Sequence, residues 1–129
     1  MVLTDNGESI AYDKLVLALG SRVREVDVEG ANLRGVHYLR GIDDVAAIRD
    51  DMTANRNVVI VGAGYIGLEV AAVCRQLGLD VTVIEMADRV MSRVVSPHVS
   101  DFYALEHTNH GVRLRLATGL REFVGDDGV

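Results

Sequence analysis

Three glycines at a fixed spacing are the residues of this sequence best suited to binding chemistry, because they let a phosphate approach the backbone. They lie in the run Gly62-Ala63-Gly64-Tyr65-Ile66-Gly67. In a dinucleotide-binding loop of this pattern, the first glycine permits a tight turn, the second leaves space for the pyrophosphate and the third allows close packing of helix on strand. Free N–H groups at the start of the following helix then bind the phosphates. A tight strand-to-helix turn that binds no ligand is the alternative interpretation.

An acidic residue follows at the distance expected for a ribose contact. Glu85 comes 23 residues after Gly62, at the end of the next apolar run, and such a carboxylate accepts hydrogen bonds from the adenosine ribose. A carboxylate there also repels a 2′-phosphate, so the sequence favours NAD over NADP. Arg89 and Arg93 follow in one loop and would reduce this repulsion if they faced the nucleotide. Alternatively, they are surface charges that pair with Glu85 or Asp88.

Other residue types that often do chemistry give weaker signals. Glu69 stands just after the third glycine, in the expected first turn of the helix, where the helix dipole alone already favours a carboxylate. Cys74 lies among apolar residues and is expected in the core. The sequence also has four histidines, which are His37, His98, His107 and His110. Their spacing is not that of metal ligands, so surface or capping roles are favoured and no metal site is predicted.

The elements that must position the glycine loop alternate between strands and helices. In chain order, the patterns predict a buried strand at 58–61, a helix at 64–78, a strand at 81–84, a helix at 97–110 and a half-exposed strand at 112–116. A glycine ends each of the two helices. This alternation predicts an α/β fold, a Rossmann-like βαβαβ unit with a parallel sheet and right-handed crossovers.

The first fifty residues show different patterns. An extended segment at 2–4 runs into Asn6-Gly7, a strong signal for a tight turn between strands. The continuous apolar run at 15–19 predicts a strand that is buried on both faces. Residues 21–37 read as irregular, and an amphipathic pattern predicts a short helix at 42–52 that Asp43 and Asp44 help to start.

At the other end of the sequence, a last strand is expected at 119–124. The run Gly125-Asp126-Asp127-Gly128 then reads as the tip of a hairpin. Because the sequence stops there, we expect its C-terminal part to be incomplete.

The composition restricts the classes of function. The chain has 129 residues, room for about one domain, and a formal net charge of −6, which argues against a nucleic-acid partner because phosphate backbones are bound by basic patches. No apolar stretch approaches the roughly 20 residues of a transmembrane helix, and no signal peptide is recognisable. A membrane role is therefore not expected. The single cysteine fits a reducing cytoplasm.

Three stretches of the sequence resemble a known family. They are the segment from Tyr12 to Arg22, the segment from Val36 to Asp44, and the region from the strand at 58–61 through the glycine loop and Glu85 to residue 112. In these stretches the chain resembles the FAD-dependent pyridine nucleotide–disulfide oxidoreductases, and most closely their ferredoxin- and rubredoxin-reductase branch. The region from 85 to 112 is the part most particular to that branch.

The resemblance implies two cofactors, NAD(H) and FAD, and further site residues. The segment at 12–22 resembles the one that closes the FAD domain and contacts the flavin. Glu69 resembles the glutamate that approaches the nicotinamide carboxamide, and Ile66 resembles a residue that lines the same pocket, with ordinary helix packing as the alternative. The expected cofactor contacts are therefore Ala18, Gly20, Gly62, Ala63, Gly64, Tyr65, Ile66, Gly67, Glu69, Glu85 and Arg93.

The resemblance also implies a division of the chain. Residues 1–24 correspond to the end of an FAD-binding domain, residues 25–56 to a crossover with a short helix, and residues 57–129 to an NAD-binding domain that is incomplete at its C-terminus. The glycine-rich unit that holds FAD in this family has no counterpart in the sequence. We therefore expect the chain to be a portion of a larger enzyme, without turnover of its own.

The function implied is the NAD(H)-binding part of a reductase that passes electrons from NADH through flavin to a ferredoxin or rubredoxin. No side chain is expected to act as an acid, a base or a nucleophile, because the flavin carries out the electron chemistry. Two alternatives stay open: a free-standing NAD-binding module without flavin, and part of a disulfide reductase of the same superfamily. The acceptor and the oligomeric state are not readable from the sequence.

Overall fold

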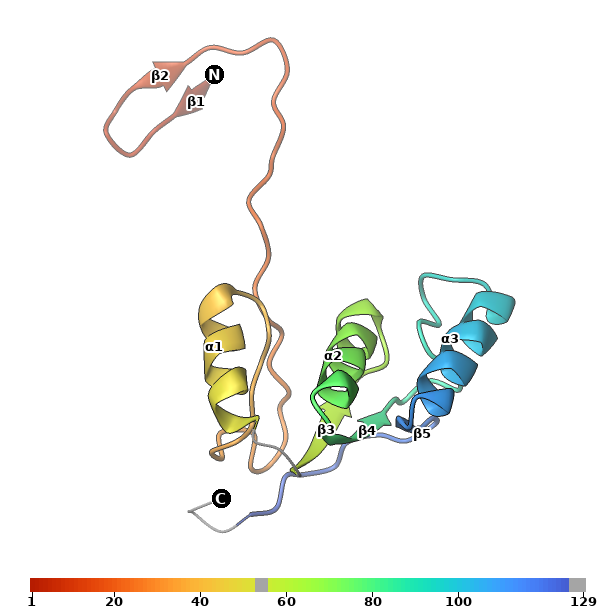
Figure 1. Ribbon diagram of the computed structural model, residues 1–129. Coiled ribbons are helices and arrows are strands. Elements are labelled where there is room, and N and C mark those ends of the chain that lie inside the picture. Colours follow the sequence, from red (N-terminus) through yellow and green to blue (C-terminus); the bar gives the residue numbers. More distant parts are fainter. Residues whose placement is uncertain (53–55, 126–129) are drawn as a thin grey trace.

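The computed structural model describes residues 1–52 and 56–125. Figure 1 shows an N-terminal hairpin on a long extended segment, followed by helices that stand beside one another, with a small sheet below those nearer the C-terminus. The elements in chain order are β1 (Val2–Leu3), β2 (Ser9–Ile10), α1 (Ile42–Asp51), β3 (Asn57–Val61), α2 (Tyr65–Gln76), β4 (Asp80–Ile84), α3 (Pro97–Asn109) and β5 (Arg113–Arg115).

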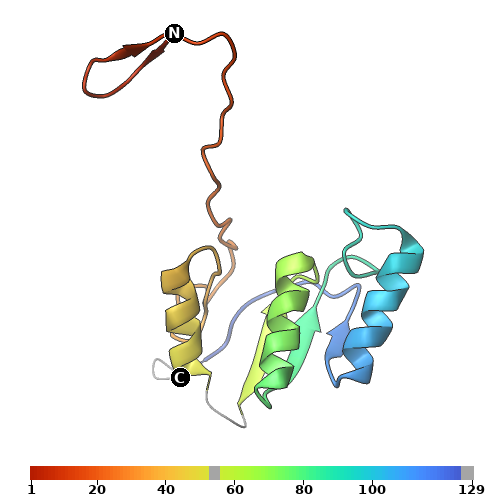
Figure 2. The same cartoon turned by 45° about the horizontal axis from the view of Figure 1, so that its top comes forward.

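The sheet that carries the glycine loop is parallel, as the sequence predicts. Its strands lie in the order β3-β4-β5, with Val58 opposite Val81 and Ile60 opposite Val83. Helices α2 and α3 lie on the same face of this sheet (Figure 2), because two successive right-handed crossovers that advance in one direction place their helices on one side. The predicted α/β class and the βαβαβ unit are confirmed.

The core lies between this sheet and its two helices. Val81 and Val83 of β4 are fully buried, and α2 contributes Leu68, Ala71 and Cys74. These three recur every third residue, so they share the face of α2 that meets the sheet. Cys74 is a free, buried cysteine, in the core where its apolar neighbours predicted it.

A glycine ends α2 and turns the chain into β4. Gly78 has φ +81°, and its N–H donates to Arg75 O at 3.0 Å while Leu79 N–H donates to Cys74 O at 3.0 Å. These two bonds form a Schellman motif, which favours glycine at the left-handed position. The turn delivers Leu79 into the core, where it is 1% exposed.

The second face of the sheet is open, which corrects one expectation. Val59 is 62% exposed and Val61 is 45% exposed, so the prediction of a buried strand at 58–61 holds only for the face that carries Val58 and Ile60. A continuous apolar run is typical of a strand with cover on both sides. Here α2 and α3 cover one face, and no other described helix or strand packs on the sheet.

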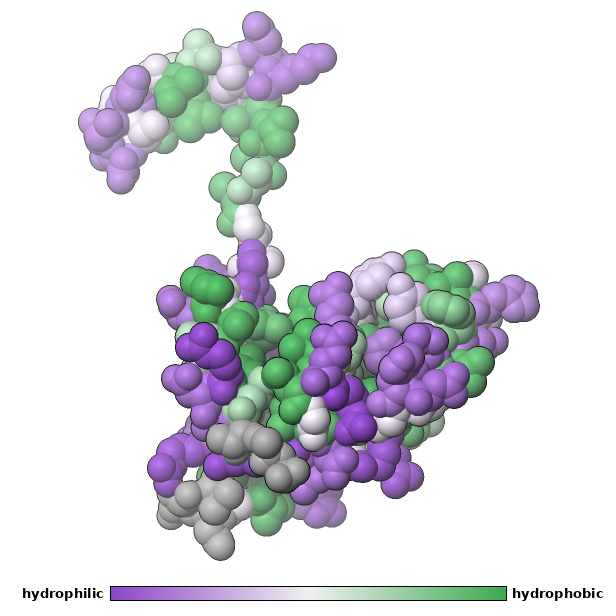
Figure 3. Space-filling model, viewed as in Figure 1, coloured by the Kyte–Doolittle hydropathy of each residue, from purple (hydrophilic) through white to green (hydrophobic). Residues whose placement is uncertain are grey.

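Of the predictions for extended segments in the N-terminal part, one is confirmed and one is wrong. β1 and β2 pair antiparallel around the Asn6-Gly7 turn, as expected. The apolar run at 15–19 forms no strand, and its leucines and valine are exposed: Leu15 48%, Val16 85%, Leu17 71% and Leu19 87%. Figure 3 shows hydrophobic surface along the extended segment below the hairpin. A strand needs a hydrogen-bonded neighbour, and no described segment pairs with this one.

Helix α1 forms where the sequence predicts it. The carboxylate of Asp44 accepts the N–H of Gly41 at 2.7 Å and the N–H of Arg40 at 2.8 Å. These two bonds, that of Gly41 first, lower the pKa of Asp44. Residues 21–37 are irregular, as expected, and none of the described helices is long and apolar enough to cross a membrane.

The strand expected at 119–124 does not form. Its residues make only an isolated bridge, between Glu122 and Glu29, in which Phe123 N–H donates to Glu29 O at 2.8 Å. The segment at 28–35 approaches it as turns rather than as a strand, so no longer ladder develops. Most of the hairpin tip expected at 125–128 lies outside the described residues.

Candidate functional site

The glycine loop joins β3 to α2 with the geometry that its spacing requires. Gly62 has φ +104°, and its N–H donates to Ile84 O at 2.8 Å. A Cβ added to Gly67 would lie 2.0 Å from Gly62 O and 3.4 Å from Ile60 Cγ2. The first glycine therefore makes the turn, and the third lets α2 approach the strand more closely than any side chain would allow.

The middle of the loop leaves room for a ligand. A Cβ at Gly64 would meet no atom within 4 Å, and Gly64 is the N-cap of α2, whose first turn holds no acidic residue. Unpaired N–H groups and the positive end of the helix dipole suit an anion at this position. The residues present therefore fit the pyrophosphate of a dinucleotide.

Glu85 is fixed against the glycine loop by both of its carboxylate oxygens. Oε2 accepts the N–H of Ala63 at 2.8 Å, and Oε1 accepts the N–H of Ala87 at 2.8 Å. Ala63 itself is fully buried. Each carboxylate oxygen has a second lone pair, so the side chain keeps acceptor capacity for ribose hydroxyls. The bonds hold it at the carboxyl end of β4, where α/β sheets bind their ligands.

The two arginines after Glu85 have different environments. Arg89 turns inward, and its guanidinium binds Ser92 O, Val95 O and Ser100 Oγ. It therefore pairs with neither Glu85 nor Asp88, so that interpretation of Arg89 is wrong, while its effect on a nucleotide phosphate stays a prediction. A local charge pattern does not show that loop carbonyls will surround the guanidinium. Arg93 is exposed, and its part in nucleotide binding stays a prediction.

The loop after β5 also reaches this site, which the sequence did not indicate. Ala117 N–H donates to Ala87 O at 2.8 Å, and Thr118 N–H donates to Glu85 O at 2.8 Å. Ala117 has φ +49°, a left-handed conformation that is more common for glycine. The residue type at 117 therefore did not predict the turn. A Cβ at Gly119 would meet nothing within 4 Å. The segment 117–119 therefore borders the same end of the sheet as Glu85.

Glu69 lies further along α2 than expected. It is the fifth residue of the helix, beyond the first turn, which contains no acidic residue. The helix dipole acts mainly within the first turn, so it does not explain why a carboxylate stands at position 69. Glu69 borders a shallow hollow of about 200 Å³ together with Tyr65, Met91 and His107. Ile66 is 59% exposed, so ordinary core packing does not account for it either.

The two residues expected near a flavin lie away from the glycine loop. Ala18 and Gly20 belong to the extended segment that Figures 1 and 2 show apart from α2 and β3. Gly20 has φ +72°, and the guanidinium of Arg40 lies beside it, with its Nε donating to Ser21 O at 3.1 Å. The described residues form no cradle around these two positions, and their contact with a flavin stays a prediction.

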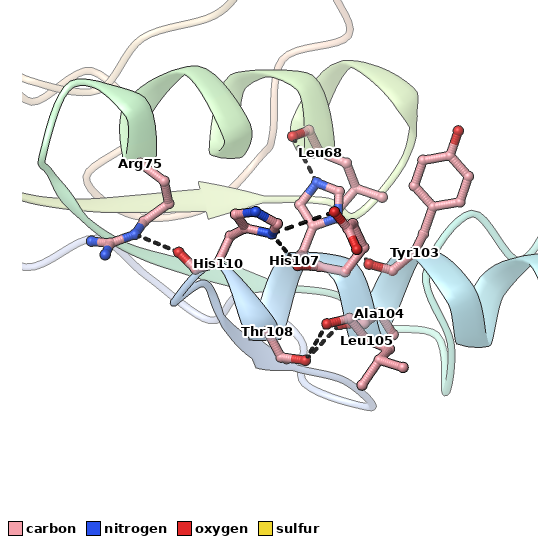
Figure 4. Close-up of polar contacts among 9 residues, drawn as sticks. Leu68, Arg75, Tyr103, Ala104, Leu105, His107, Thr108 and His110 are labelled. Carbon is pink, nitrogen blue, oxygen red and sulfur yellow. Dashed lines mark hydrogen bonds and ion pairs between the residues drawn. The ribbon is translucent and has the colours of Figure 1, made fainter.

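His37, His107 and His110 make hydrogen bonds within the protein. Figure 4 shows His107 between α2 and α3, with Nδ1 2.8 Å from Tyr103 O and Nε2 3.1 Å from Leu68 O. His110 Nδ1 lies 2.8 Å from Glu106 O, and His37 pairs with Asp51 at 2.6 Å. No group of three or more potential metal ligands gathers in residues 1–52 and 56–125.

Comparison with known proteins identifies the family. The family model described as pyridine nucleotide-disulphide oxidoreductase matches residues 1–129. The chain belongs to this family. Among its members, the rhodocoxin reductase of Rhodococcus erythropolis is 48% identical over 120 residues, which are 93% of this chain and 28% of the relative. The rubredoxin-NAD(+) reductase of Pseudomonas putida is 40% identical over 128 residues, 99% of this chain and 33% of that protein.

A solved family member shares the fold. A ferredoxin reductase from Rhodopseudomonas palustris superposes with a TM-score of 0.82 at 42% identity, over 95% of this chain and 30% of that one. The chain thus spans about a third or less of the length of the relatives it matches. The ferredoxin- and rubredoxin-reductase resemblance of the sequence is confirmed.

Proposed function

We propose that this chain forms the NAD(H)-binding part of an FAD-dependent oxidoreductase that passes electrons from NADH through the flavin to a ferredoxin or rubredoxin. The observation that carries the proposal is the Glu85 carboxylate, held by the N–H groups of Ala63 and Ala87 beside the open position at Gly64. The names of the relatives, a rhodocoxin reductase, a rubredoxin-NAD(+) reductase and a ferredoxin reductase, support the reaction class and the type of acceptor.

The division of labour within the chain follows from the site. Residues 57–129 bind the nucleotide: the start of α2 takes the pyrophosphate, and Glu85 takes the adenosine ribose. The exposed side chains of Ile66 and Glu69 face the nicotinamide half, with Arg93 at the edge of the site. Residues 1–24 complete the FAD-binding part through Ala18 and Gly20, and residues 25–56 connect the two. The flavin supplies hydride acceptance and single-electron release.

The location and the nucleotide preference complete the proposal. We place the protein in the cytoplasm, because its single cysteine is a free thiol and reducing compartments keep thiols free. Glu85 favours NADH over NADPH, because its carboxylate accepts bonds from two ribose hydroxyls and repels a 2′-phosphate. The guanidinium of Arg89 binds Ser92 O, Val95 O and Ser100 Oγ rather than the Glu85 carboxylate.

Parallel calorimetric titrations of the intact protein with NAD+ and NADP+ test the proposal. We expect NAD+ to bind at least about tenfold more tightly, a difference of roughly 1.4 kcal/mol. The variant Glu85→Ala should weaken NAD+ binding and leave NADP+ binding nearly unchanged. Equal losses for the two nucleotides would remove the role assigned to Glu85. Binding of neither nucleotide by the wild-type protein would refute the proposal as a whole.

Flavin content separates the proposal from a nucleotide-binding module without flavin. The intact protein should purify with FAD and reduce a ferredoxin or rubredoxin with NADH. NADH binding without flavin and without electron transfer would favour the module instead.

A further inference from the structure

The inward turn of Arg89 places its guanidinium at the centre of the loop between β4 and α3. Its Nη1 donates to Val95 O at 3.0 Å and to Ser100 Oγ at 2.7 Å, and its Nη2 donates to Ser92 O at 2.6 Å. One guanidinium therefore ties the chain after β4 to the first turns of α3. Hydrogen bonds from a charged donor are stronger than neutral ones, so the tie is firm.

Ser100 adds a fourth hydrogen bond to this network. It is 1% exposed, and it is the one buried polar residue in the described part of the chain. Its hydroxyl accepts from Arg89 and donates to Val90 O at 2.6 Å. A hydroxyl has one proton to donate and lone pairs to accept with, so Ser100 links the guanidinium to the backbone just before Met91.

Met91 connects this hydrogen-bonded network to the glycine loop. Its φ of +49° lies in the left-handed region, which is strained for a residue with a Cβ and is kept only where the surroundings impose it. The side chain is 3% exposed in the core, and the N–H donates to Ala63 O at 2.8 Å.

Ala63 is thus held from two sides. Its carbonyl accepts from Met91, and its N–H donates to the Glu85 carboxylate. A shift of Met91 would move the Ala63 peptide, and with it both the turn at Gly62 and the orientation of Glu85. Small displacements of this kind weaken binding, since binding groups must be held to within a fraction of an ångström.

From this chain of contacts, we propose that Arg89 and Ser100 are positioning residues of the nucleotide site, which act through Met91 and Ala63. The inference rests on the proposed NAD(H) function and adds two residues that the nucleotide does not contact. It also assigns a role to the strained conformation of Met91, which holds the loop down on Ala63.

The chain offers a matched control arginine. Arg75 also binds backbone carbonyls, with Nε 3.0 Å from His110 O and Nη1 on Leu79 O, and it lies near Asp80 at 3.5 Å. It lies at the end of α2, where β4 begins, while Arg89 follows the end of β4. Lysine keeps the charge but lacks the planar fork of donors, so Arg89→Lys and Arg75→Lys remove comparable bonds from opposite ends of the sheet.

The experiment measures NAD+ affinity by calorimetry, thermal unfolding, and the rate of flavin reduction at saturating NADH, in the intact protein. We expect Arg89→Lys to raise the Kd for NAD+ about tenfold and Ser100→Ala about threefold, in line with the loss of hydrogen bonds that position a site. The rate at saturating NADH should change little. Arg75→Lys should lower the unfolding temperature about as much as Arg89→Lys does, but it should leave the Kd for NAD+ within about twofold of the wild-type value.

Two results would overturn the inference. One is wild-type affinity for NAD+ in both Arg89→Lys and Ser100→Ala. The other is an equal rise in Kd in Arg75→Lys, because the effect would then follow general stability rather than position. Failure of the wild-type protein to bind NAD+ is a different outcome, since it refutes the proposed function itself.

Discussion

Two apolar runs of similar length have opposite fates in this molecule. The run at 58–61 becomes β3, pairs with β4 and packs Val58 and Ile60 against the core. The run at 15–19 stays extended without a partner, and Val16 and Leu19 are 85% and 87% exposed. Both runs are wholly apolar, although 58–61 consists of β-branched residues, which favour strands, and 15–19 is mostly leucine. The difference shows that a strand needs a neighbour that pairs with it and a helix that covers it, in addition to apolar residues.

The comparison also separates what the chain stabilises by itself from what it leaves to other surfaces. Residues from β3 to β5 have their own core, centred on Val81 and Val83. The apolar segment at 15–19 buries little against the rest of the described chain. Soluble proteins rarely leave such a contiguous apolar surface uncovered, so we expect a further surface to cover it in the intact protein.

The largest expected effect lies at the closest contact in the first of these regions. A side chain at Gly67 would collide with Gly62 O, which a Cβ would approach to 2.0 Å. We expect Gly67→Val to lower the free energy of unfolding by about 3 kcal/mol, the upper range for overpacking, because the obstacle is backbone. NAD+ binding should be lost with it. Urea unfolding and calorimetric titration of the intact protein measure both.

Gly64 provides the control three residues earlier. A Cβ there meets nothing within 4 Å, and its φ of −81° is open to any residue. Gly64→Ala should therefore change stability by less than about 0.5 kcal/mol, and still weaken NAD+ binding because the methyl group occupies the phosphate space. Comparable unfolding losses in the two variants would contradict the distinct roles given to the two glycines.

The second prediction tests the two apolar regions directly. Leu17 is 71% exposed, and Val83 is fully buried. In the 129-residue chain alone, Leu17→Ser should change the unfolding free energy by less than about 0.5 kcal/mol, whereas Val83→Ser should cost about 2–3 kcal/mol.

In the intact protein, Leu17→Ser should become costly as well, at about 2 kcal/mol for the lost burial, and should reduce the flavin content. If Leu17→Ser stayed harmless in the intact protein, the segment at 15–19 would be exposed there too. The expectation that another surface covers it would then be wrong.

The same comparison explains how far the sequence predicted this structure. The region from β3 to β5 was predictable because its signals are local: the glycine spacing, the apolar runs, Gly78 and Gly111 as helix ends. Each of these signals acts on neighbours within a few residues or on the next strand. The exposure of 15–19 and of the second face of β3 could not be predicted, because the cover of a strand comes from elements distant in sequence.

The site shows the same limit. Gly62, Gly67 and Glu85 lie where the pattern placed them, because one βαβ unit fixes all three. The inward turn of Arg89 depends on carbonyls of the following loop and on Ser100, and the approach of Ala117 depends on the end of β5. Neither is encoded in a short motif, so both needed the folded chain.

A smaller effect on stability is expected at Cys74, which lies in the core of the region from β3 to β5. Burial raises the pKa of its thiol, so the folded state holds the proton more tightly than the unfolded chain. The thiolate is the reactive form. We expect a thiol reagent at pH 8 to label Cys74 at least about tenfold more slowly in the folded chain than in urea.

The sign of the pH effect follows from the same shift. Stability that depends on the protonated thiol is present below the unfolded pKa and is lost as the pH rises through and above it. Cys74→Ala should remove this alkaline component. Labelling as fast in the folded chain as in urea would show that the core around Cys74 opens readily.

The smallest effect is expected at Asp44, which starts α1 in the more open part of the chain. The N–H groups of Gly41 and Arg40 lower the pKa of its carboxyl, so the support they give α1 is present above the unfolded pKa and is lost as the pH falls through the lower, folded one. Asp44→Asn should speed amide exchange in the first turn of α1 at neutral pH and abolish the acid dependence of that exchange.

Asp43→Asn removes the same charge from the same turn but leaves the two bonds of Asp44 in place, so it should speed the exchange less. Equal effects would mean that the helix dipole alone, and not the bonds to Gly41 and Arg40, supports this end of the helix. The start of α1 would then depend on charge, while the glycine loop depends on close contact.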